Sequence, residues 1–467
     1  MTSKSGKILL RGGTVLTLEP GDDPFVGDVL VESGKIAAIG PDIAADPASC
    51  EIVDAVGRIV FPGFVDTHRH LWQSPFRLAG ADWLVPDYCG AMYRNAGPLY
   101  TPQDLGSALR IGLFDALNAG VTQVFDWNHN VNSPEHADAT VAAHASTGAR
   151  VIFGYGQSTP VWAVLLDPTI GTSNAMPSDD LERVRREHYA SNSGLLRLAM
   201  AARGPEVSPM GIVIAEAEQA KRLGLRSSLH VGNGPLGTNG TIRKMRDAGI
   251  LDSTFTFIHC NTLPTEELEM MTAAGCSASV STELEQHMGH GHPAATRLLA
   301  AGIRPSLSVD TCTNVSGDLF AVMRATLSAV RGDANAEVLK SGGMPDKVAL
   351  SAREILEFAT IEGARANGTA ACCGTLAVGK DADIAVISTD APNLLPLTNP
   401  YGAVVMGAHP GNIETVLVAG AFVKRNFELV AISIADLRRE AEALQTSLGE
   451  RIAQLPVSND RPQVANF

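Results

Sequence analysis

Short runs of apolar residues alternate with segments of helical spacing through the middle of this chain. The runs occupy residues 59–70, 121–126, 150–155, 195–201, 226–230, 255–259, 277–281 and 305–310. Each run is short enough for a buried strand, while intervening segments such as 104–119 and 294–301 have the apolar spacing of amphipathic helices. Eight strand–helix units over about 300 residues predict an α/β fold, a (β/α)8 barrel of the TIM type.

The two ends of the chain have a different pattern, in which apolar and polar residues alternate over short runs. Residues 8–17 and 28–40 form such runs, with a predicted hairpin turn at residues 32–35. Similar runs return at 374–387 and 413–423, so we expect both ends to form one small β-sandwich. The expected units are an N-terminal β-sandwich segment (1–61), the barrel (62–370), a C-terminal β-sandwich segment (371–432), and a final helix and tail (433–467).

Composition and charge narrow the classes of function. The 467 residues are 45% hydrophobic and 18% charged, which is typical of a well-packed α/β enzyme. A formal net charge of -14 and a pI of 5.3 argue against nucleic acid or an anionic membrane as partners. No window reaches the roughly 18 uninterrupted apolar residues of a spanning helix. Because residues 1–7 also lack a secretory apolar stretch, we expect a cytoplasmic protein.

Metal-binding side chains stand at the ends of several predicted strands. They are His68 and His70 on the first strand, His230 on the fifth, His259 on the sixth and Asp310 on the eighth. Because residues i and i+2 of a strand share a face, His68 and His70 can reach one ion together. Imidazole and carboxylate suit zinc, iron or another divalent first-row metal. Such an ion activates water, and an adjacent carboxylate such as Asp310 can accept the proton.

Residues 62–70, together with the strand ends at His230, His259 and Asp310, resemble the amidohydrolase superfamily. The resemblance covers nearly the whole chain, including residues 374–384, which are similar to that family's returning β-sandwich strands. It implies one divalent metal ion per chain, with zinc favoured and iron, cobalt or manganese as alternatives. The implied ligands are His68, His70, His230 and Asp310. The resemblance also implies that Asp310 and His259 are catalytic, with His259 hydrogen-bonding the attacking water.

Two features distinguish this chain within that superfamily. Binuclear members carry a bridging lysine or carboxylate at the end of the fourth strand. Residues 200–206 contain no lysine, and Glu206 would serve only on a longer strand, which favours a single metal ion. Deaminases of the mononuclear branch carry a glutamate three residues after the fifth-strand histidine, where this chain has Asn233. Asparagine cannot shuttle a proton, so Glu283 and Glu285 are alternative acids unless they lie on a solvated loop.

Substrate contacts are expected from the loops beyond the strand ends. Aromatic residues gather there and favour an apolar pocket for a mostly neutral ligand, although loop packing also explains them. The loop at residues 281–293 contains His287, His290 and His292, and we expect it to face the substrate, with a second metal site as the alternative. The expected substrate contacts are Asn233, Trp72, Trp83, Tyr155, Glu283 and His290.

These observations lead to one hypothesis and two alternatives. We expect a metal-dependent hydrolase that cleaves a C–N bond of a small, mostly neutral amide, urea or carbamate with an aromatic or apolar body. This activity is similar to that of phenylurea and molinate hydrolases, which belong to xenobiotic degradation. The alternatives are a deaminase or dechlorinase of a triazine, purine or pyrimidine ring, and a metal-free scaffold. We further expect a small-molecule substrate and a homo-oligomer, without nucleic acid or membrane partners.

Overall fold

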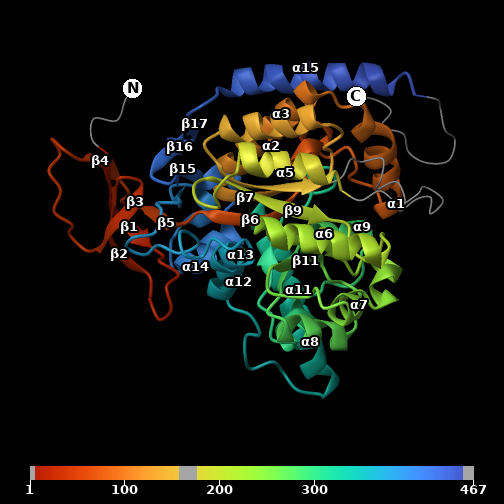
Figure 1. Cartoon of the computed structure of the whole chain (residues 1–467). Coiled ribbons are helices and arrows are strands. Elements are labelled where there is room, and N and C mark those ends of the chain that lie inside the picture. The colour runs from red at the N-terminus through yellow and green to blue at the C-terminus, as the bar shows by residue number, and fades with distance from the viewer. Residues whose placement is uncertain (1–5, 157–175, 456–467) are drawn as a thin grey trace.

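The computed structural model describes residues 6–156 and 176–455, which form two separate sheets (Figure 1). The larger body has eight parallel strands that pair in chain order. They are β6 (Phe64–Arg69), β7 (Val121–Asn128), β8 (Arg150–Gly156), β9 (Leu196–Ala202), β10 (Ser227–Val231), β11 (Phe255–His259), β12 (Ser277–Val280) and β13 (Ser306–Leu307). Beyond β13, Asp310 N donates to His68 O (2.9 Å) and brings the last strand beside the first. The predicted α/β barrel is therefore confirmed.

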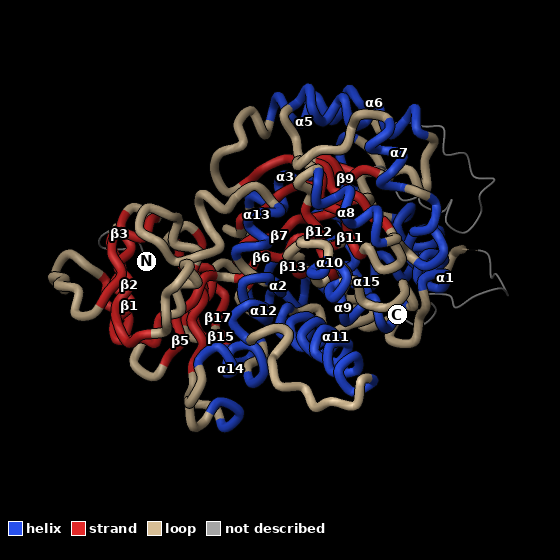
Figure 2. The backbone as a smooth tube through the Cα atoms, turned by 90° about the horizontal axis from the view of Figure 1, so that it is seen from below, coloured by secondary structure: helices blue, strands red, loops and turns tan. Residues whose placement is uncertain are grey.

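Helices surround this barrel, as Figure 2 shows. Those between the strands are α2 (Pro102–Asn118), α3 (Pro134–Ala145), α5 (Ser178–Glu187), α6 (Met210–Leu223), α7 (Thr241–Asp247), α8 (Thr265–Ala273), α9 (Thr282–Met288) and α10 (Ala295–Ala300). After β13 follow α11 (Leu319–Lys340), α12 (Ala352–Phe358), α13 (Ile361–Ala366) and the short α14 (Pro400–Gly402). Helix α2 begins at a capping box of Thr101 and Asp104, with Pro102 in its first turn, which explains why it starts there.

The second sheet combines the two ends of the chain. Its strands are β1 (Lys7–Val15), β2 (Phe25–Glu32), β3 (Lys35–Gly40), β4 (Glu51–Asp54), β5 (Arg58–Pro62), β14 (Ile384–Ser388), β15 (Ile413–Val418), β16 (Ala421–Arg425) and β17 (Glu428–Leu429). Strand β5 pairs with β14 and thereby joins the N-terminal strands to the C-terminal ones, as expected. The predicted hairpin between β2 and β3 turns at Ser33 and Gly34, both with positive φ.

The apolar run at residues 59–70 is two strands rather than the single strand that its composition suggests. Residues up to Pro62 belong to the second sheet, and residues from Phe64 belong to the barrel. The change of sheet occurs at Gly63, where a Cβ atom would lie only 2.1 Å from Thr122 Cγ2. Only glycine lets the chain pass so close to β7, so this residue allows β6 to enter the barrel.

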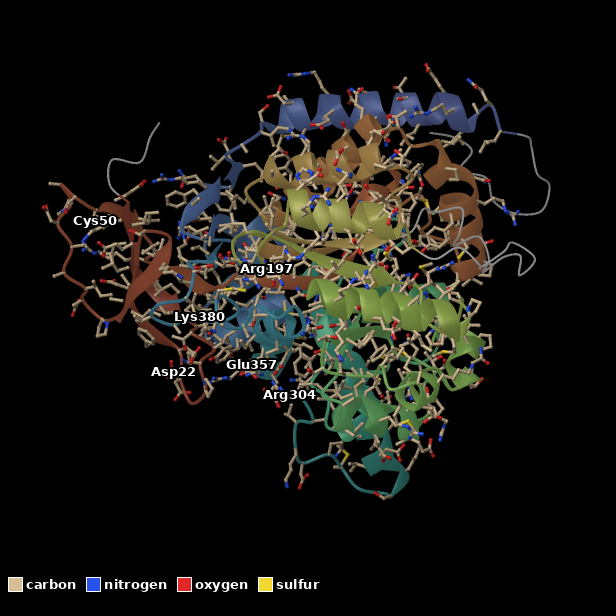
Figure 3. All side chains as sticks on the ribbon, viewed as in Figure 1. Asp22, Cys50, Arg197, Arg304, Glu357 and Lys380 are labelled. Atoms are coloured by element: carbon tan, nitrogen blue, oxygen red, sulfur yellow. The ribbon has the colours of Figure 1, made fainter. Side chains whose placement is uncertain are left out.

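Buried charges join the barrel to the second sheet. Arg150 of β8 donates from Nε to Asp383 (2.8 Å) and from Nη2 to Asp381 (2.8 Å), and its side chain is almost fully buried. Nearby, Arg197 of β9 donates to Cys372 Sγ (3.4 Å), and both Arg197 and Lys380 are labelled at this junction in Figure 3. These charge-assisted hydrogen bonds fix the two sheets relative to each other.

Helix α15 (Ile434–Ile452) lies along the outside of the barrel, at the top of Figure 1. Leu444 and Leu448 are its buried apolar residues, and Arg451 pairs with Asp104 at the start of α2 (2.6 Å). This agrees with the helix expected from the apolar spacing of residues 434–455. Within the described residues, no helix has the length and apolar character required to cross a membrane.

Candidate active site

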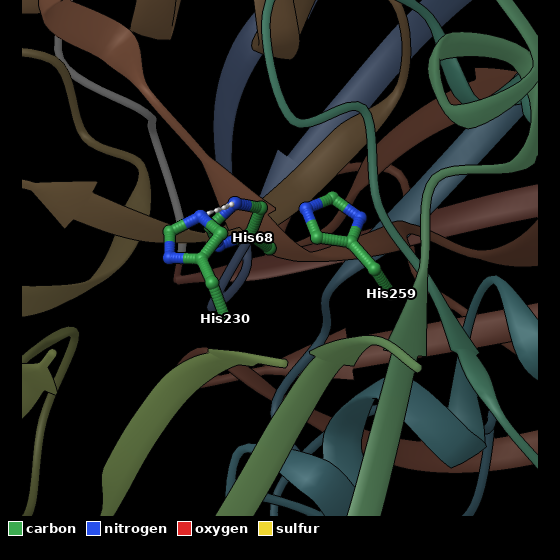
Figure 4. Close-up of side chains that lie close together, drawn as sticks. All are labelled: His68, His230 and His259. Atoms are coloured by element: carbon green, nitrogen blue, oxygen red, sulfur yellow. Dashed lines mark hydrogen bonds between the residues drawn. The ribbon is translucent and has the colours of Figure 1, made fainter. Parts of the chain in front are cut away.

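Four histidines and one aspartate meet at the carboxyl ends of the barrel strands. His68 lies near the end of β6, His70 directly follows it, His230 is on β10, His259 ends β11, and Asp310 follows β13. Figure 4 shows the imidazoles of His68, His230 and His259 turned toward one another. The structure therefore brings together all five residues that the strand-end pattern singles out.

The distances between the polar atoms are short enough for one ion to lie among them. His68 Nε2 is 3.1 Å from His230 Nε2 and 3.4 Å from Asp310 Oδ1. His70 Nε2 is 3.2 Å from Asp310 Oδ1, and His259 Nε2 is 3.4 Å from Asp310 Oδ2. Two groups, His68–His230–His259 and His68–His70–Asp310, each offer ligand atoms within 4.8 Å of one another. This set of nitrogen and carboxylate ligands fits a divalent first-row metal ion.

The protonation pattern of the cluster supports the same assignment. His70 Nδ1 lies 2.8 Å from the carbonyl oxygen of Trp127, which only accepts, so Nδ1 carries a proton and Nε2 is the atom that faces Asp310. Burial lowers the pKa of His68 to about 3 and the pKa of His230 well below its ordinary value, which favours neutral rings. Lone pairs that face one another across about 3 Å are stabilised by a cation between them.

A buried carboxylate contacts His259 at the ring nitrogen that does not face Asp310. His259 Nδ1 lies 3.0 Å from Glu285 Oε1, and the same oxygen accepts from Ser281 N (2.8 Å). Burial alone would lower the pKa of His259, but the hydrogen bond to Glu285 and the charge of Asp310 outweigh it and raise the pKa. Glu285 therefore orients His259, and it is not the solvated or acid-supplying residue that the sequence allowed.

The backbone at two of these residues is strained. His259 has φ of 76° and Asp310 has φ of 66°, a region that non-glycine residues rarely occupy. Such a conformation costs of the order of 1–3 kcal/mol per residue and persists only where the surroundings enforce it. At Asp310, the backbone hydrogen bonds with His68 and His70 enforce it, so the strain there accompanies the convergence of the side chains.

A cavity opens above the cluster. Most of its exposed wall area is apolar, although many of the lining residues also carry a polar group. The lining comprises His70, Val85, Tyr88, Cys89, Tyr93, Arg203, Glu206, Val207, His230, Asn233, Leu236, His259, Leu284, Met288, His290, Asp310 and Thr311. A cavity with a mostly apolar wall and convergent polar groups is typical of a site for a small molecule.

Two of the six expected substrate contacts, Asn233 and His290, line this cavity. The Oδ1 atom of Asn233 is buried and has no hydrogen-bond partner among the described residues, and the same holds for His290 Nδ1. The rings of His290 and His259 pack edge to face, with their centroids 4.6 Å apart. Burial lowers the pKa of His290 to about 3. Both side chains are thus available to a substrate that lies above His259.

The other four expected contacts lie outside the cavity lining. The Trp72 indole is fully buried and donates to His129 Nδ1 (2.9 Å), while the Tyr155 hydroxyl donates to Asp180 (2.6 Å). Glu283 instead accepts a hydrogen bond from the Ser316 hydroxyl (3.2 Å). Trp83 packs against the hydrophobic core from a partly exposed position. Three of these residues are therefore packing aromatics, which was the alternative explanation for the aromatic loops.

The expected substrate contacts did not include two tyrosines and one glutamate of the lining. Tyr88 and Tyr93 come from the helical segments α1 (Val85–Tyr88) and η2 (Cys89–Ala96), and Glu206 follows β9. The aromatic richness of the loop after His70 was a signal for the tyrosines, but it did not distinguish them from Trp72. For Glu206, the signal was its position shortly after the fourth barrel strand.

The alternative of a second metal site in the loop after β12 finds no support among the described residues. The residue groups that could hold a metal ion contain neither His287 nor His292. His292 is exposed and pairs with Asp333 of α11 (3.0 Å). Of the three histidines in this loop, His290 is the one that reaches the cavity.

Comparison with known proteins points to one family. The model of the amidohydrolase family matches residues 59–423. A 5-methylthioadenosine/S-adenosylhomocysteine deaminase from Syntrophobacter fumaroxidans is 26% identical over 458 residues, which cover 94% of this chain and 97% of the relative. A 5'-deoxyadenosine deaminase from Methanothermobacter thermautotrophicus is 24% identical, and the match covers 90% of this chain and 95% of that protein.

Solved structures share the fold. Atrazine chlorohydrolase from Arthrobacter aurescens, solved in complex with zinc, aligns with a TM-score of 0.80 at 24% identity and covers 94% of this chain and 100% of its own. An adenosine deaminase from Xanthomonas campestris with bound zinc aligns with a TM-score of 0.79 at 19% identity, covering 95% of this chain and 98% of its own. At these identities the similarity establishes the fold.

Proposed function

This chain belongs to the amidohydrolase family, and from that premise we propose that it hydrolyses a C–N bond of a small, mostly neutral amide, urea or carbamate. The observation that carries the proposal is the convergence of His68, His70, His230 and Asp310 beneath a largely apolar cavity. The curated relatives are deaminases, which hydrolyse C–N bonds, and two solved relatives hold zinc, whereas the substrate class is proposed from the cavity of this chain.

We propose that one divalent ion is held by His68, His70, His230 and Asp310, with zinc favoured because two solved relatives were crystallised with it. When bound, such an ion acts as a Lewis acid that eases deprotonation of water and stabilises developing negative charge. A single ion is favoured because the end of β9 presents Arg203 to the cavity and no lysine that could bridge two metals.

Asp310 and His259 are the proposed proton acceptors. Asp310 borders the cavity, and its Oδ2 lies 3.4 Å from His259 Nε2, so a proton taken from water by the carboxylate can pass to the imidazole. Glu285 accepts from His259 Nδ1 and stabilises the imidazolium that results. The backbone hydrogen bonds of Asp310 and the contact of His259 with Glu285 keep the two acceptors in place, so little reorganisation is needed when the proton moves.

The proposed substrate class follows from the cavity wall. Val85, Leu236, Leu284 and Met288 offer apolar contacts and no charge. Arg203 is the arginine of the lining, and its Nη2 lies 3.9 Å from Glu216 Oε1. The positive charge of Arg203 is therefore balanced within the protein. A neutral molecule with an apolar or aromatic body suits this wall better than an anion does.

The Tyr88 hydroxyl is the proposed donor to a substrate oxygen. It accepts hydrogen bonds from Gln73 Nε2 (2.5 Å) and from the Tyr93 hydroxyl (3.3 Å), so both of its lone pairs are used. Its own proton therefore remains to be donated, and Tyr88 borders the cavity. A carbonyl oxygen of an amide, urea or carbamate provides the matching acceptor.

Deamination of a heteroaromatic ring is the second candidate. The names of the two curated relatives, both deaminases of adenosine-type compounds, favour it. Asn233 argues against it, because its amide faces the cavity where a proton-shuttling acid would be useful and cannot itself supply a proton.

One experiment separates the two candidates. Metal content per chain is measured on a sample that is also assayed against phenylureas, thiocarbamates, aminopurines and aminotriazines. The proposal expects one bound metal, release of amine from the ureas or thiocarbamates, and no ammonia from the rings. Ammonia from a ring would establish the deaminase instead, and a metal-free, inactive protein would point to the scaffold alternative.

A further inference from the structure

We propose that Glu206 is the acid that donates a proton to the departing nitrogen, an inference that rests on the proposed C–N hydrolysis. The bridging-ligand role considered for this residue does not apply, because Glu206 lies in the loop after β9 and is in none of the residue groups that could hold a metal ion. The inference rests on three points. Glu206 lies in the cavity wall, its carboxyl group is anchored by hydrogen bonds, and the reaction needs a proton donor.

Glu206 is anchored through one oxygen and leaves the other available. Its Oε1 accepts from Gly232 N (2.8 Å) and from Thr241 Oγ1 (3.2 Å). No described residue forms a hydrogen bond with Oε2, although the side chain borders the cavity. A carboxyl group that is fixed by one oxygen and exposed to the cavity by the other is positioned to exchange a proton with a ligand.

The environment of Glu206 also favours the protonated form. Burial raises its pKa to about 7, while the hydrogen bonds from Gly232 and Thr241 oppose that shift incompletely. A carboxyl group with a pKa near 7 is a competent donor at physiological pH, because a large fraction of it is protonated and it still releases its proton readily.

C–N hydrolysis needs such a donor, because an amine leaves far more readily after it has gained a proton. In the balanced step, the water oxygen bonds to the carbonyl carbon while one water proton passes to Asp310. The O–H bond of Glu206 then breaks as an N–H bond forms, and the C–N bond breaks with its electron pair going to nitrogen. Solvent takes the proton from Asp310 and returns one to Glu206, so the net reaction consumes one water.

Other carboxyl groups near the site are already engaged. Among the described residues of the lining, Glu206 and Asp310 bear the carboxyl groups, and Asp310 is the proposed proton acceptor. Glu285 is buried behind His259, and Glu283 bonds to Ser316 outside the lining. Asn233, in the loop whose Gly232 anchors Glu206, has only an amide. Glu206 is thus the carboxyl group left for the donor role.

The test compares Glu206→Gln with wild-type enzyme on ring-substituted phenylureas that differ in the basicity of the leaving aniline. Glutamine keeps an acceptor oxygen for Gly232 and Thr241 but cannot donate as an acid. Glu362→Gln is the matched control, because Glu362 is a buried carboxylate that accepts from Arg304 Nε (2.6 Å) outside the cavity.

We expect Glu206→Gln to lower kcat about 100-fold for the most basic leaving aniline and progressively less for weakly basic ones. Glu362→Gln should stay within about threefold of wild type on every substrate. A uniform loss across the series, or no loss, would overturn the inference while leaving the proposed function intact. If wild-type enzyme hydrolyses none of the phenylureas, the proposed substrate class fails, and the inference that rests on it fails too.

Discussion

The floor and the wall of the cavity are built in different ways. The floor consists of His68, His70, His230, His259 and Asp310, which lie on strands or shortly after them. His230 is partly buried, and the other four are buried. The wall comes from loops and short helices, and its side chains are mostly apolar. This difference teaches that the type of reaction depends on the barrel itself, whereas the choice of substrate depends on the segments that connect its strands.

The floor should respond most strongly to mutation. Replacing Asp310 with asparagine removes the proposed proton acceptor and one metal ligand, so kcat should fall about 10³-fold while the circular dichroism spectrum is unchanged. The control is Asp333→Asn, which changes an aspartate that pairs with the exposed His292. If Asp310→Asn retains wild-type turnover, Asp310 is not the proton acceptor.

Mutation of Glu285, which contacts His259 of the floor, should give the next largest loss of kcat. Glu285→Gln weakens the hydrogen bond that orients His259, and we expect kcat to fall about 10- to 100-fold with little change in KM. Glu283→Gln alters the same residue type in the same helix but outside the lining, so it should have little effect. Equal losses in both variants would show that the helix, rather than the contact with His259, is responsible.

The wall should respond more weakly. Tyr88→Phe removes one hydrogen bond to the substrate, worth about 1 kcal/mol, so kcat/KM should fall about fivefold. Tyr155→Phe removes a hydroxyl that bonds to Asp180 outside the lining and should leave kcat/KM unchanged. Steady-state kinetics on one phenylurea tests both variants. The opposite ranking would restore Tyr155 as the substrate contact that the sequence suggested.

A wall variant that acts on a new class of substrate would sharpen the contrast between floor and wall. Asn233→Glu places a second carboxyl group in the wall, so we expect new ammonia release from aminotriazines or aminopurines. Hydrolysis of phenylureas should continue at a reduced rate, because the floor is untouched while a wall residue that can contact the substrate has changed. If no ammonia appears, the absence of an acid at Asn233 is not what prevents ring deamination.

The sequence predicted the floor well because strand geometry is local. The spacing of His68 and His70, and the positions of His230, His259 and Asp310 after apolar runs, follow from strand periodicity and barrel topology. The same reasoning located the eight barrel strands and the pairing of the two chain ends. It missed only the change of sheet at Gly63, which depends on the close approach of Thr122 from a distant strand.

The wall was harder to predict because side-chain directions in loops depend on tertiary contacts. Trp72 and Tyr88 lie in the same aromatic loop region. Trp72 is buried and donates to His129, whereas Tyr88 accepts from Gln73 and borders the cavity. Glu206 became a candidate only through its contact with Gly232, which belongs to the next strand's loop. No periodic pattern in the sequence encodes such contacts.

Metal content and its link to turnover test the central claim most directly. Metal per chain is measured for wild type and for His230→Ala, together with phenylurea hydrolysis before chelation, after chelation and after return of zinc. The account predicts one ion per wild-type chain, loss of activity on chelation with recovery on zinc addition, and a depleted, inactive His230→Ala variant. Hydrolysis that persists in metal-free protein would contradict it.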